Sequence, residues 1–404
     1  MRPLDGVRVL DLSRLLPGPF CTLILSDLGA RVDKVEDPHV GDYMRMFPPL
    51  VTVGGKEGAA QHSFSGRFAA INRDKRSLCL DLKKPAGREA LLRLLPRYDV
   101  LVESFRPGVL DRLGLGLATL HEKNPKLVVC SITGYGQDGP YRERAGHDLN
   151  YVGLAGVLGL SGAGPDAPPH PLPIQLADLA AGALWPAVRI LAALRAAEHS
   201  GRGTHLDVAM CEGALTFLIP DLGNLAASGQ VPPRGADLLT GGAASYGVYK
   251  TQDGSYVSVG ALEPKFWLAM NAVLGRPADT SELLAPPAEQ ARIRDEIQAI
   301  FAQKTRAEWL QKFDGVDACV EPVLSLDELR NHPQHKAREL FFEIDGGAAP
   351  LAQVRTPALP LEATAAVRPP PGLGQHSREI LREAGYSDAE IAALLDSGAS
   401  RAGP

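Results

Sequence analysis

Cysteines are few and scattered in this sequence of 404 residues, which contains five of them. Cys21, Cys79, Cys130, Cys211 and Cys319 stand singly, without a C-x-x-C pair. An odd number of isolated cysteines in mainly apolar surroundings argues against a disulfide framework. We expect all five to be reduced residues of the core.

Long apolar runs and a strong excess of one charge are also lacking. The apolar stretch at residues 191–197 is interrupted by Arg195 and is far shorter than the roughly 18 residues that cross a bilayer. The N-terminal residues 1–12 lead directly into a strand-like pattern, without the features of a signal peptide. A formal net charge of −5 argues against a general nucleic-acid surface. These absences predict a cytoplasmic protein with no membrane insertion and no nucleic-acid partner.

Signatures of several common sites are missing. The loop at residues 13–19 has one glycine, whereas a dinucleotide fingerprint has three, so we expect no nicotinamide or flavin. A serine nucleophile elbow, a P-loop, an EF-hand and a zinc pattern are absent. His332 and His335 flank a proline and have no third ligand nearby in the sequence, so we expect no metal.

Strand-like and helix-like segments alternate in the first part of the chain. Strand patterns occupy residues 7–12, 31–36, 77–82, 99–105 and 126–133, and helical patterns occupy residues 20–28, 86–95 and 117–123. Short strands separated by such helices imply right-handed crossovers and a mainly parallel sheet with helices on both faces. The predicted fold class is α/β, with a Rossmann-like large domain.

A smaller α+β domain is predicted in the middle of the chain. Helical patterns cover residues 148–158 and 176–199, and Pro186 should kink the second or begin a new segment. After a linker-like stretch at 228–244, strand patterns at 246–249 and 256–259 flank Asp253-Gly254, a hairpin signal. Helical patterns follow at 264–274, 288–303 and 306–313, prolines near 350–360 and 369–371 indicate extended connections, and 377–383 and 388–395 form a last helical pair. We expect a large domain at 1–225, completed by 345–404, and a small domain at 226–344.

His147 and Asp148 lie at the expected start of a helix, after a turn rich in glycine and proline. A helix N-terminus exposes backbone N–H groups that can stabilise an oxyanion, while a neighbouring imidazole moves a proton. Alternatively, Asp148 is only a helix cap and His147 a hydrogen-bonded structural residue. The local sequence leaves both interpretations open.

Two further acids and a basic cluster are candidates. Asp178 lies in an apolar helix start, where burial would raise its pKa and suit it to acid/base chemistry, although capping is the alternative. Glu263 precedes a predicted helix whose first turn it could equally cap. The cations Arg73, Lys75, Arg76 and Arg106 lie at strand ends, where they suit phosphate binding or a solvated surface.

Short motifs follow one another along almost the whole chain. They are residues 4–11 (LDGVRVLD), 17–19 (PGP), 27–30 (DLGA), 72–77 (NRDKRS), 103–108 (ESFRPG), 134–140 (GYGQDGP), 201–203 (GRG) and 373–376 (LGQH). In this order they resemble the superfamily of family III CoA-transferases and α-methylacyl-CoA racemases. The resemblance implies a large lobe from both chain ends, a small lobe from the middle, and a homodimer of two interlocked subunits. Asp178 of one subunit would then face Glu263 of the other.

Three features resemble the racemase branch of this superfamily. His147 precedes the acid where transferases more often have tyrosine, Glu263 stands in Glu-Pro-x-Phe, and Leu16 replaces a glutamine of formyl-CoA transferase. Ile174-Gln175 departs from the Asn-Leu of characterised racemases. In the transferase branch the aspartate at the position of Asp178 is a nucleophile that forms acyl-anhydride and aspartyl-CoA intermediates.

The racemase resemblance implies inversion of the α-carbon of 2-methyl-branched acyl-CoA thioesters. His147 and Asp178 would exchange the α-proton, the backbone N–H near Asp148 would stabilise the enolate, and Glu263 would orient His147. No cofactor is expected beyond coenzyme A, which is part of the substrate. At the strand end Glu36-Asp37-Pro38, acid replaces an arginine that can serve the CoA phosphates in the family. The expected binding residues are therefore Lys34, Arg73, Arg76 and Arg106, with Leu16 and Tyr151 in the substrate site.

Overall fold

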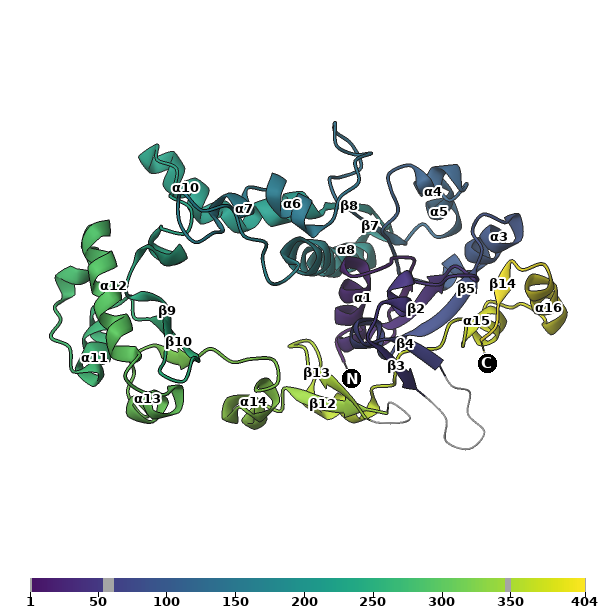
Figure 1. Cartoon of the computed structure of the whole chain (residues 1–404). Helices are drawn as coiled ribbons and strands as arrows, with labels where there is room; N and C mark the ends of the chain where they lie inside the picture. Colours follow the sequence, from purple (N-terminus) through teal and green to yellow (C-terminus); the bar gives the residue numbers. More distant parts are fainter. Residues whose placement is uncertain (1, 54–61, 346–349, 404) are drawn as a thin grey trace. The chain divides into compact units, whose positions relative to one another are not determined.

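The computed structural model describes residues 2–53, 62–345 and 350–403 (Figure 1). Its contacts divide the chain into two compact units. Unit 1 comprises Met1–Ala155, Ile174–Thr216 and Pro333–Pro404, and unit 2 comprises Gly156–Pro173 and Phe217–His332. These limits differ from the expected ones, because residues 156–173 and 217–225 belong to unit 2 and residues 333–344 to unit 1.

Unit 1 is built on a seven-stranded sheet with the order β14-β5-β2-β1-β6-β7-β8. Its strands are β1 (Arg8–Asp11), β2 (Arg31–Glu36), β5 (Arg76–Leu80), β6 (Val100–Glu103), β7 (Val128–Thr133), β8 (His205–Ala209) and β14 (Ser400–Arg401). All neighbouring pairs are parallel except β5 with β14. The six parallel strands have the order of a doubly wound dinucleotide-binding fold. The predicted parallel α/β sheet is therefore confirmed.

Helices cover both faces of this sheet. One face packs against α3 (Pro85–Leu94), α5 (Leu117–Lys123), α15 (Ser377–Glu383) and α16 (Asp388–Asp396), in a core that includes Leu10, Leu78, Leu101 and Ile380. The other face carries α1 (Pro17–Asp27) and α8 (Trp185–Ser200), which contact each other. Burial on both faces suits the mainly apolar strands β6 and β7, whereas β2 carries the buried charged residues Asp33, Lys34 and Glu36.

The helix that precedes α8 is irregular and brings Asp178 into unit 1. Residues Ala177–Leu184 form a π-helical segment, η3, and α8 begins at Trp185 with Pro186 in its first turn. The expectation that Pro186 begins a new segment is confirmed. Together η3 and α8 form one stretch, Ala177–Ser200, which within the described residues is long and apolar enough to cross a membrane by length and composition. In unit 1 this stretch packs against α1, β7 and α9 (Met210–Leu215), as a core helix does.

Glycines allow η3 to approach its neighbours closely. A Cβ added to Gly182 would lie 2.8 Å from side-chain atoms of both Met210 and Pro17, and one added to Gly213 would lie 2.7 Å from Ala181. The start of α1, η3 and α9 are therefore fixed against one another where Asp178 is held.

Unit 2 contains a three-stranded sheet, β11-β10-β9, and several helices. The strands are β9 (Tyr246–Lys250), β10 (Tyr256–Gly260) and β11 (Val320–Pro322), and the main helices are α10 (Ile219–Ser228), α11 (Pro264–Leu274), α12 (Pro287–Phe301) and α13 (Arg306–Phe313). Antiparallel pairing of β9 with β10 confirms the predicted hairpin. Trp267, Tyr249 and Phe301 form the centre of its core.

Two expectations are wrong. Residues near 350–360 were expected to be an extended connection, but β12 (Phe341–Ile344) and β13 (Leu351–Val354) form an antiparallel hairpin. Cys21, Cys79 and Cys130 are buried as expected, whereas Cys211 is half-buried and Cys319 is exposed. Cys319 also has a positive φ of 52° and directly precedes β11, outside the core.

Candidate active site

A pocket of about 650 Å³ lies in unit 1 at the carboxyl ends of the parallel strands. Its wall includes Arg14 after β1, Phe105 after β6, Thr133 at the end of β7 and Met210 after β8. Strands β1 and β6 are neighbours from which the chain crosses to opposite sides of the sheet, and ligands of doubly wound folds bind at such a switch point. The position of the pocket thus follows from the strand order.

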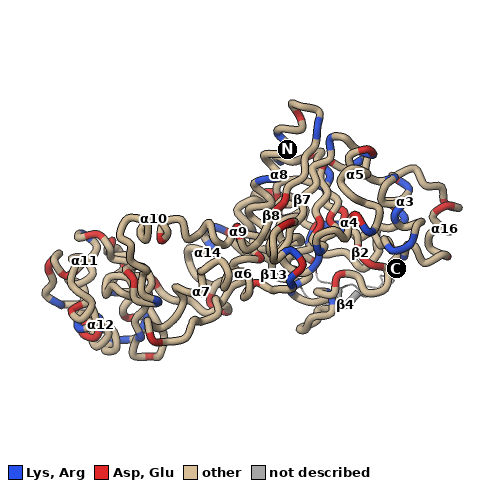
Figure 2. The backbone as a smooth tube through the Cα atoms, turned by 90° about the horizontal axis from the view of Figure 1, so that it is seen from above, with Lys and Arg blue, Asp and Glu red and all other residues tan. Residues whose placement is uncertain are grey.

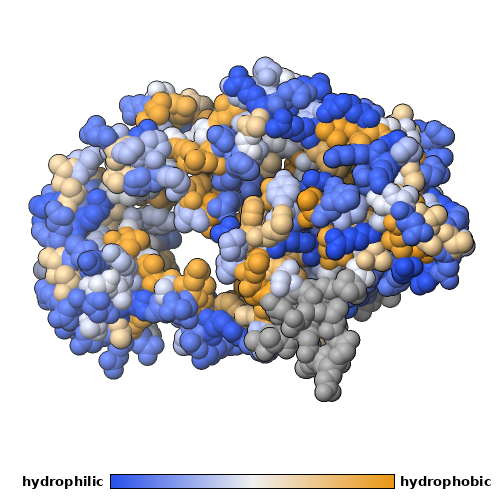
Figure 3. Space-filling view, turned by 45° about the vertical axis from the view of Figure 1, so that its right-hand side comes forward, coloured by the Kyte–Doolittle hydropathy of each residue, from blue (hydrophilic) through white to orange (hydrophobic). Residues whose placement is uncertain are grey.

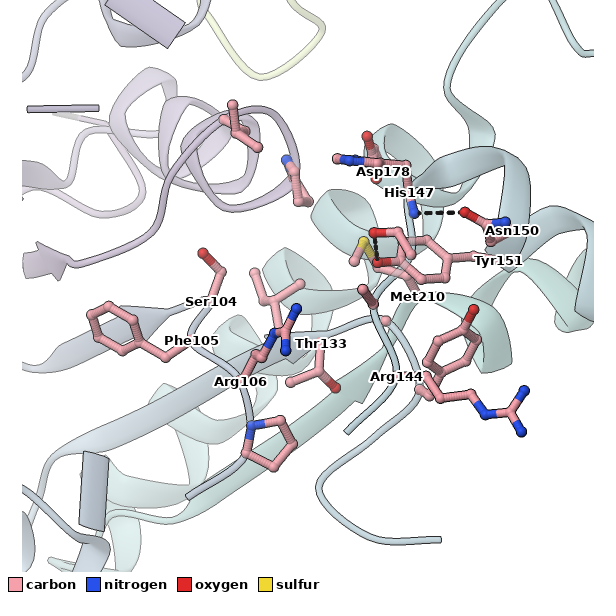
Figure 4. Close-up of a pocket in the computed structure, with 18 of the residues that line it drawn as sticks. Ser104, Phe105, Arg106, Thr133, Arg144, His147, Asn150, Tyr151, Asp178 and Met210 are labelled. Carbon is pink, nitrogen blue, oxygen red and sulfur yellow. Dashed lines mark hydrogen bonds between the residues drawn. The ribbon is translucent and has the colours of Figure 1, made fainter. Parts of the chain in front are cut away.

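His147 and Asp178 line this same pocket (Figure 4). His147 is exposed and directly precedes α6 (Asp148–Leu154). Its backbone N–H donates to Oδ1 of Asn150 at 3.0 Å. The capping bond therefore uses the main chain of His147, and the position of its side chain on the pocket wall allows the imidazole to meet a ligand.

Asp178 and Asp148 are connected by a hydrogen bond. The backbone N–H of Asp178 donates to Oδ1 of Asp148 at 3.1 Å. Burial, followed by the negative charge of Asp148, raises the pKa of Asp178 to about 7. Asp148 thus acts as a helix cap, which was the alternative interpretation of this residue. The segment that it caps is η3, which carries Asp178. A carboxyl group with a pKa near neutrality can both accept and donate a proton at physiological pH.

Tyr151 supports the loop that carries His147. Its hydroxyl donates to the carbonyl oxygen of Gly146 at 2.5 Å, and its ring lies edge-on to Tyr135 at 5.1 Å. A Cβ at Gly134 or Gly146 would approach the Tyr151 ring to 2.4 or 2.7 Å, so both glycines make room for it. Burial raises the pKa of Tyr151 to about 12, so the phenol remains a donor. Tyr151, expected in the substrate site, lines the pocket and also fixes its wall.

Four arginines line the pocket: Arg14, Arg106, Arg142 and Arg144. Arg106 is exposed, as a ligand-binding cation would be. The guanidinium of Arg144 lies over the ring of Tyr141, 3.9 Å from its centroid, and Arg142 pairs with Glu143 at 3.1 Å. Sequence reasoning found only Arg106. Arg14 was detectable in principle because it follows the first strand, whereas Arg142 and Arg144 lie in an irregular loop without a signal.

Three cations expected to bind phosphate are instead buried in ion pairs, which corrects that expectation. Lys34, Arg73 and Arg76 are at most 3% exposed. Lys34 pairs with Asp42, Arg73 with Asp27 and Arg76 with Asp33. If one of these cations left its carboxylate to bind a phosphate, a buried carboxylate without a counter-charge would remain. The three cations therefore stabilise the fold and are not free to bind a ligand. Figure 2 shows acidic and basic positions side by side in the part of the chain around β2.

Leu16 and Glu263 are not part of the pocket wall. Leu16 precedes α1 and packs against the cluster of Met44, Phe64 and Phe68. Glu263 belongs to unit 2, where it is exposed and directly precedes α11 without a side-chain bond to that helix. The capping alternative for Glu263 therefore does not hold for its side chain. Within the described ranges, no group of three His, Cys, Asp or Glu side chains could hold a metal ion.

Comparison with known proteins gives the family of the chain. The model of CoA-transferase family III matches residues 4–377. The chain belongs to CoA-transferase family III. Among family III proteins, the α-methylacyl-CoA racemase of Mus musculus is 38% identical over 97% of this chain and 96% of its own length. The succinyl-CoA:glutarate CoA-transferase of Homo sapiens is 32% identical over 98% of this chain and 90% of its own length.

A solved structure resembles this chain as well. The crystal structure of a CAIB/BAIF family protein from Brucella suis has a TM-score of 0.81 with 30% sequence identity, and the match covers 95% of this chain and 99% of that one. Racemases and CoA-transferases are both among the proteins that this chain resembles in sequence. The residues of the pocket must distinguish the two activities.

Proposed function

We propose that this family III protein is a racemase that inverts the α-carbon of 2-methyl-branched acyl-CoA thioesters. The observation that carries the proposal is the presence of His147 and Asp178 in one pocket. Inversion requires one group to remove the α-proton and a second group to return a proton on the opposite face. A pKa of about 7 for Asp178 suits reversible proton transfer near neutrality, and an imidazole is the side chain that most often serves as a general acid or base.

The proposed reaction is a 1,1-proton transfer through an enolate. One of the two groups takes the α-proton, and the electron pair of the C–H bond moves to the thioester oxygen. The backbone N–H of Asp148, the first residue of α6, is our candidate donor to that oxygen, because early N–H groups of a helix have no partner within it. The second group then donates its proton to the α-carbon and the thioester re-forms. The reaction needs no acceptor acid.

The acyl-CoA thioester is proposed to lie along the side of the pocket that is lined by arginines, with its phosphates at these arginines. Arg14 and Arg106 flank the carboxyl ends of β1 and β6, and guanidinium groups bind phosphates through paired charge-assisted hydrogen bonds. Met210 and the aromatic rings of Phe105 and Tyr135 supply apolar wall for the rest of the substrate. This arrangement replaces the phosphate role expected of the three buried cations.

We also propose a homodimer in which Glu263 of the partner subunit orients His147. The resemblance to the family supports this assembly, as does an exposed apolar face in unit 1 that begins at the last residue of η3 and continues along α8. Leu184, Trp185, Val188 and Leu191 are 36–54% exposed there, and exposed apolar patches of this kind mark interaction sites. A cytoplasmic location remains a prediction.

Deuterium exchange tests the racemase directly. A (2R)-2-methylacyl-CoA incubated in D₂O without any acceptor acid should gain α-deuterium and approach a mixture of epimers. Asp178→Asn and His147→Ala should each lower the rate by at least about 100-fold, the usual scale of general acid–base catalysis. Tyr141→Phe, a change at the edge of the same wall, is the matched control. Absence of deuterium incorporation by the wild-type protein would reject the racemase.

An acyl-CoA:carboxylate CoA-transferase is the second candidate, because transferases are among the relatives. In that reaction Asp178 would attack the thioester carbonyl, form an acyl anhydride and release CoA thiolate. A nucleophilic carboxylate must be ionised, and a pKa of about 7 keeps much of Asp178 protonated at neutral pH, which favours acid/base chemistry. Trapping of an Asp178 adduct by hydroxylamine or borohydride, together with transfer to a carboxylic acid, would establish the transferase.

A further inference from the structure

Leu15 lies in the wall of the active-site pocket and has a strained backbone. Its φ is 62°, in the left-handed region, where the Cβ of a leucine comes too close to the following carbonyl oxygen. Such a conformation persists only where neighbouring groups enforce it, and residues held in this way cluster at functional sites. The groups that enforce it at Leu15 are therefore candidates for a role in the site.

Side chains set the path of the loop at residues 13–15. All three of its backbone N–H groups donate to side-chain oxygens, at distances of 2.9 to 3.2 Å. In order along the loop, these oxygens belong to Asp11, Ser104 and Asp42. Backbone N–H groups inside a protein need partners, and here the partners come from three different segments of the chain. The loop therefore keeps its conformation only while these side chains stay in place.

The carboxylate of Asp42 connects this loop to a second part of the pocket wall. Besides the N–H of Leu15, it accepts the backbone N–H of Met44 at 3.0 Å, at the start of η1 (Tyr43–Met46). Tyr43, the first residue of η1, lines the pocket. One carboxylate thus fixes the loop and the turn that carries Tyr43 together.

Lys34 of β2 holds both the carboxylate and the loop. Its Nζ lies 3.1 Å from Oδ2 of Asp42 and donates to the carbonyl oxygen of Ser13 at 2.7 Å. Both members of the ion pair are fully buried. Burial lowers the pKa of Lys34, but the charges of Asp42 and Asp11 outweigh this effect and hold the pKa above its usual value, so the ammonium stays charged. Separation of the pair would leave two buried charges without partners, so its geometry is fixed.

We infer that Asp42 and Lys34 are positioning residues of the active site. Together they hold Leu15 in the left-handed conformation, and the preceding residue, Arg14, then lines the pocket. The inference rests on the proposed function, in which Arg14 binds a phosphate of the acyl-CoA. Neither member of the pair lines the pocket, so both act on affinity through Arg14 and not by contact with the ligand.

Calorimetric titration with CoA compares Asp42→Asn with a matched control. The variant removes the charge that pairs with Lys34 and one acceptor oxygen, so the dissociation constant of CoA should rise about tenfold. In an Arg14→Ala background the same change should have less than about a twofold effect, because the residue through which it acts is gone. Asp27→Asn breaks a similarly buried ion pair, neither member of which lines the pocket. It should lower the midpoint of thermal unfolding without changing the dissociation constant.

Variants of Leu15 test whether the pair acts by holding the strained residue. Glycine adopts a positive φ without steric cost, whereas alanine keeps that cost, and both remove the leucine side chain. The loss of CoA affinity caused by Asp42→Asn should therefore fall to about threefold in a Leu15→Gly background and stay near about tenfold in a Leu15→Ala background. A weakening of the fold alone would act equally in both. If Asp42→Asn does not fold, Asp42→Asn with Lys34→Met leaves no buried charge unpaired and replaces it in each comparison.

The outcomes separate this inference from the proposed function. An unchanged CoA affinity in the Asp42 variant, an equal loss in Asp27→Asn, or an equal loss in the glycine and alanine backgrounds would overturn the inference and leave the acyl-CoA function in place. Absence of CoA binding by the wild-type protein would remove both. The expected affinities without exchange of the α-proton in D₂O would support the positioning role and reject the racemase alone.

Discussion

The chemistry of the candidate site depends on the difference between two neighbouring carboxyl groups. Asp148 accepts the backbone N–H groups of Asp178 and Ala177, which oppose the effect of burial on its own pKa. Asp178 has no such compensation, and burial together with the charge of Asp148 raises its pKa to about 7. Two acids whose environments separate their pKa values acquire different roles. Here the fixed carboxylate positions the one that titrates.

Asp178→Asn should stabilise the protein at high pH. A carboxyl group with a raised folded pKa binds a proton more tightly in the folded than in the unfolded state, so the wild-type free energy of unfolding falls as pH rises from about 4 to about 7. The asparagine side chain does not titrate, so the variant does not lose stability in this way. At pH 8 its free energy of unfolding should exceed that of the wild type by about 2 kcal/mol, after a discount for the partial exposure of Asp178. Denaturant unfolding at pH 4 and pH 8 measures it. If the free energies of unfolding of variant and wild type differed by the same amount at pH 4 and at pH 8, Asp178 would not titrate as proposed.

Tyr151→Phe should slow the reaction more than it weakens binding. The variant leaves the carbonyl of Gly146 without its 2.5 Å donor, and the adjacent His147 loses its fixed position. We expect kcat to fall about tenfold with a stability loss of about 1 kcal/mol. Tyr141→Phe keeps the Gly146 bond and serves as control. A change in KM alone would assign Tyr151 to substrate contact instead.

At the scale of elements, the sequence predicts the helices and strands whose ends are marked by strong local signals. The expected limits of β2, α5, α11, α13 and α15 agree with the structure, because caps, glycines and prolines mark them. The hairpin of β12 and β13 was missed because its strands are four residues each and lie among prolines. The π-helical form of η3 was also not predicted. Its Gly182 packs closely against Pro17 and Met210, which are far away in the sequence.

The buried pair of Arg73 and Asp27 should connect α1 to the end of α2 (Gly66–Asn72) and contribute to stability rather than to binding. Its two guanidinium–carboxylate distances are 2.5 and 2.8 Å, and both side chains are 1% exposed. Arg73→Met leaves a buried carboxylate unpaired, which should cost about 3–5 kcal/mol in unfolding free energy. Arg73→Met with Asp27→Asn should recover part of this loss. A folded Arg73→Met protein with native stability and weakened CoA binding would restore the phosphate role.

Gly182→Ala should displace the helix that carries Asp178. The new methyl group would meet Pro17 and Met210 at 2.8 Å, and overpacking of this kind costs about 1–3 kcal/mol. Thermal unfolding measures the loss, and the deuterium-exchange rate should fall with it. Gly223→Ala in α10 is the matched control, because no atom lies within 4 Å of its added Cβ. Equal effects of the two substitutions would contradict the packing argument.

At the scale of the whole molecule, the sequence could not reveal which distant groups pair. The partners of Arg73 and Arg76 include acids far along the chain, such as Glu383 with Arg76, so a basic cluster resembled a phosphate site until the fold placed carboxylates beside it. The family resemblance, by contrast, located His147 and Asp178 in one site. Glu263 lies in unit 2, and its proposed role depends on a second copy of the chain.

The exposed face of α8 should be covered by that second copy. Leu184 at the end of η3 and Trp185, Val188 and Leu191 in α8 recur at helical spacing and are exposed. Figure 3 shows hydrophobic residues at several places on the surface. Sedimentation should give twice the 43.0 kDa of the chain. Val188→Glu should dissociate the dimer at micromolar concentration, because a charge cannot be buried unpaired. Leu284→Glu, at a 91% exposed leucine of unit 2, should leave it intact.

Complementation between subunits tests whether a site uses residues of both copies. Asp178→Asn and Glu263→Gln proteins, each weakly active alone, are co-expressed with different tags and the mixed dimer is purified. If Asp178 and Glu263 of different subunits form a site, one of the two sites in the mixed dimer has both native acids. In a random mixture about half of the dimers are mixed, so roughly one quarter of the wild-type exchange activity should be recovered. If both acids of a site came from one subunit, every site in the mixed dimer would lack one of them. Recovery of activity therefore requires the shared site, and its absence in a purified mixed dimer would contradict the interlocked arrangement.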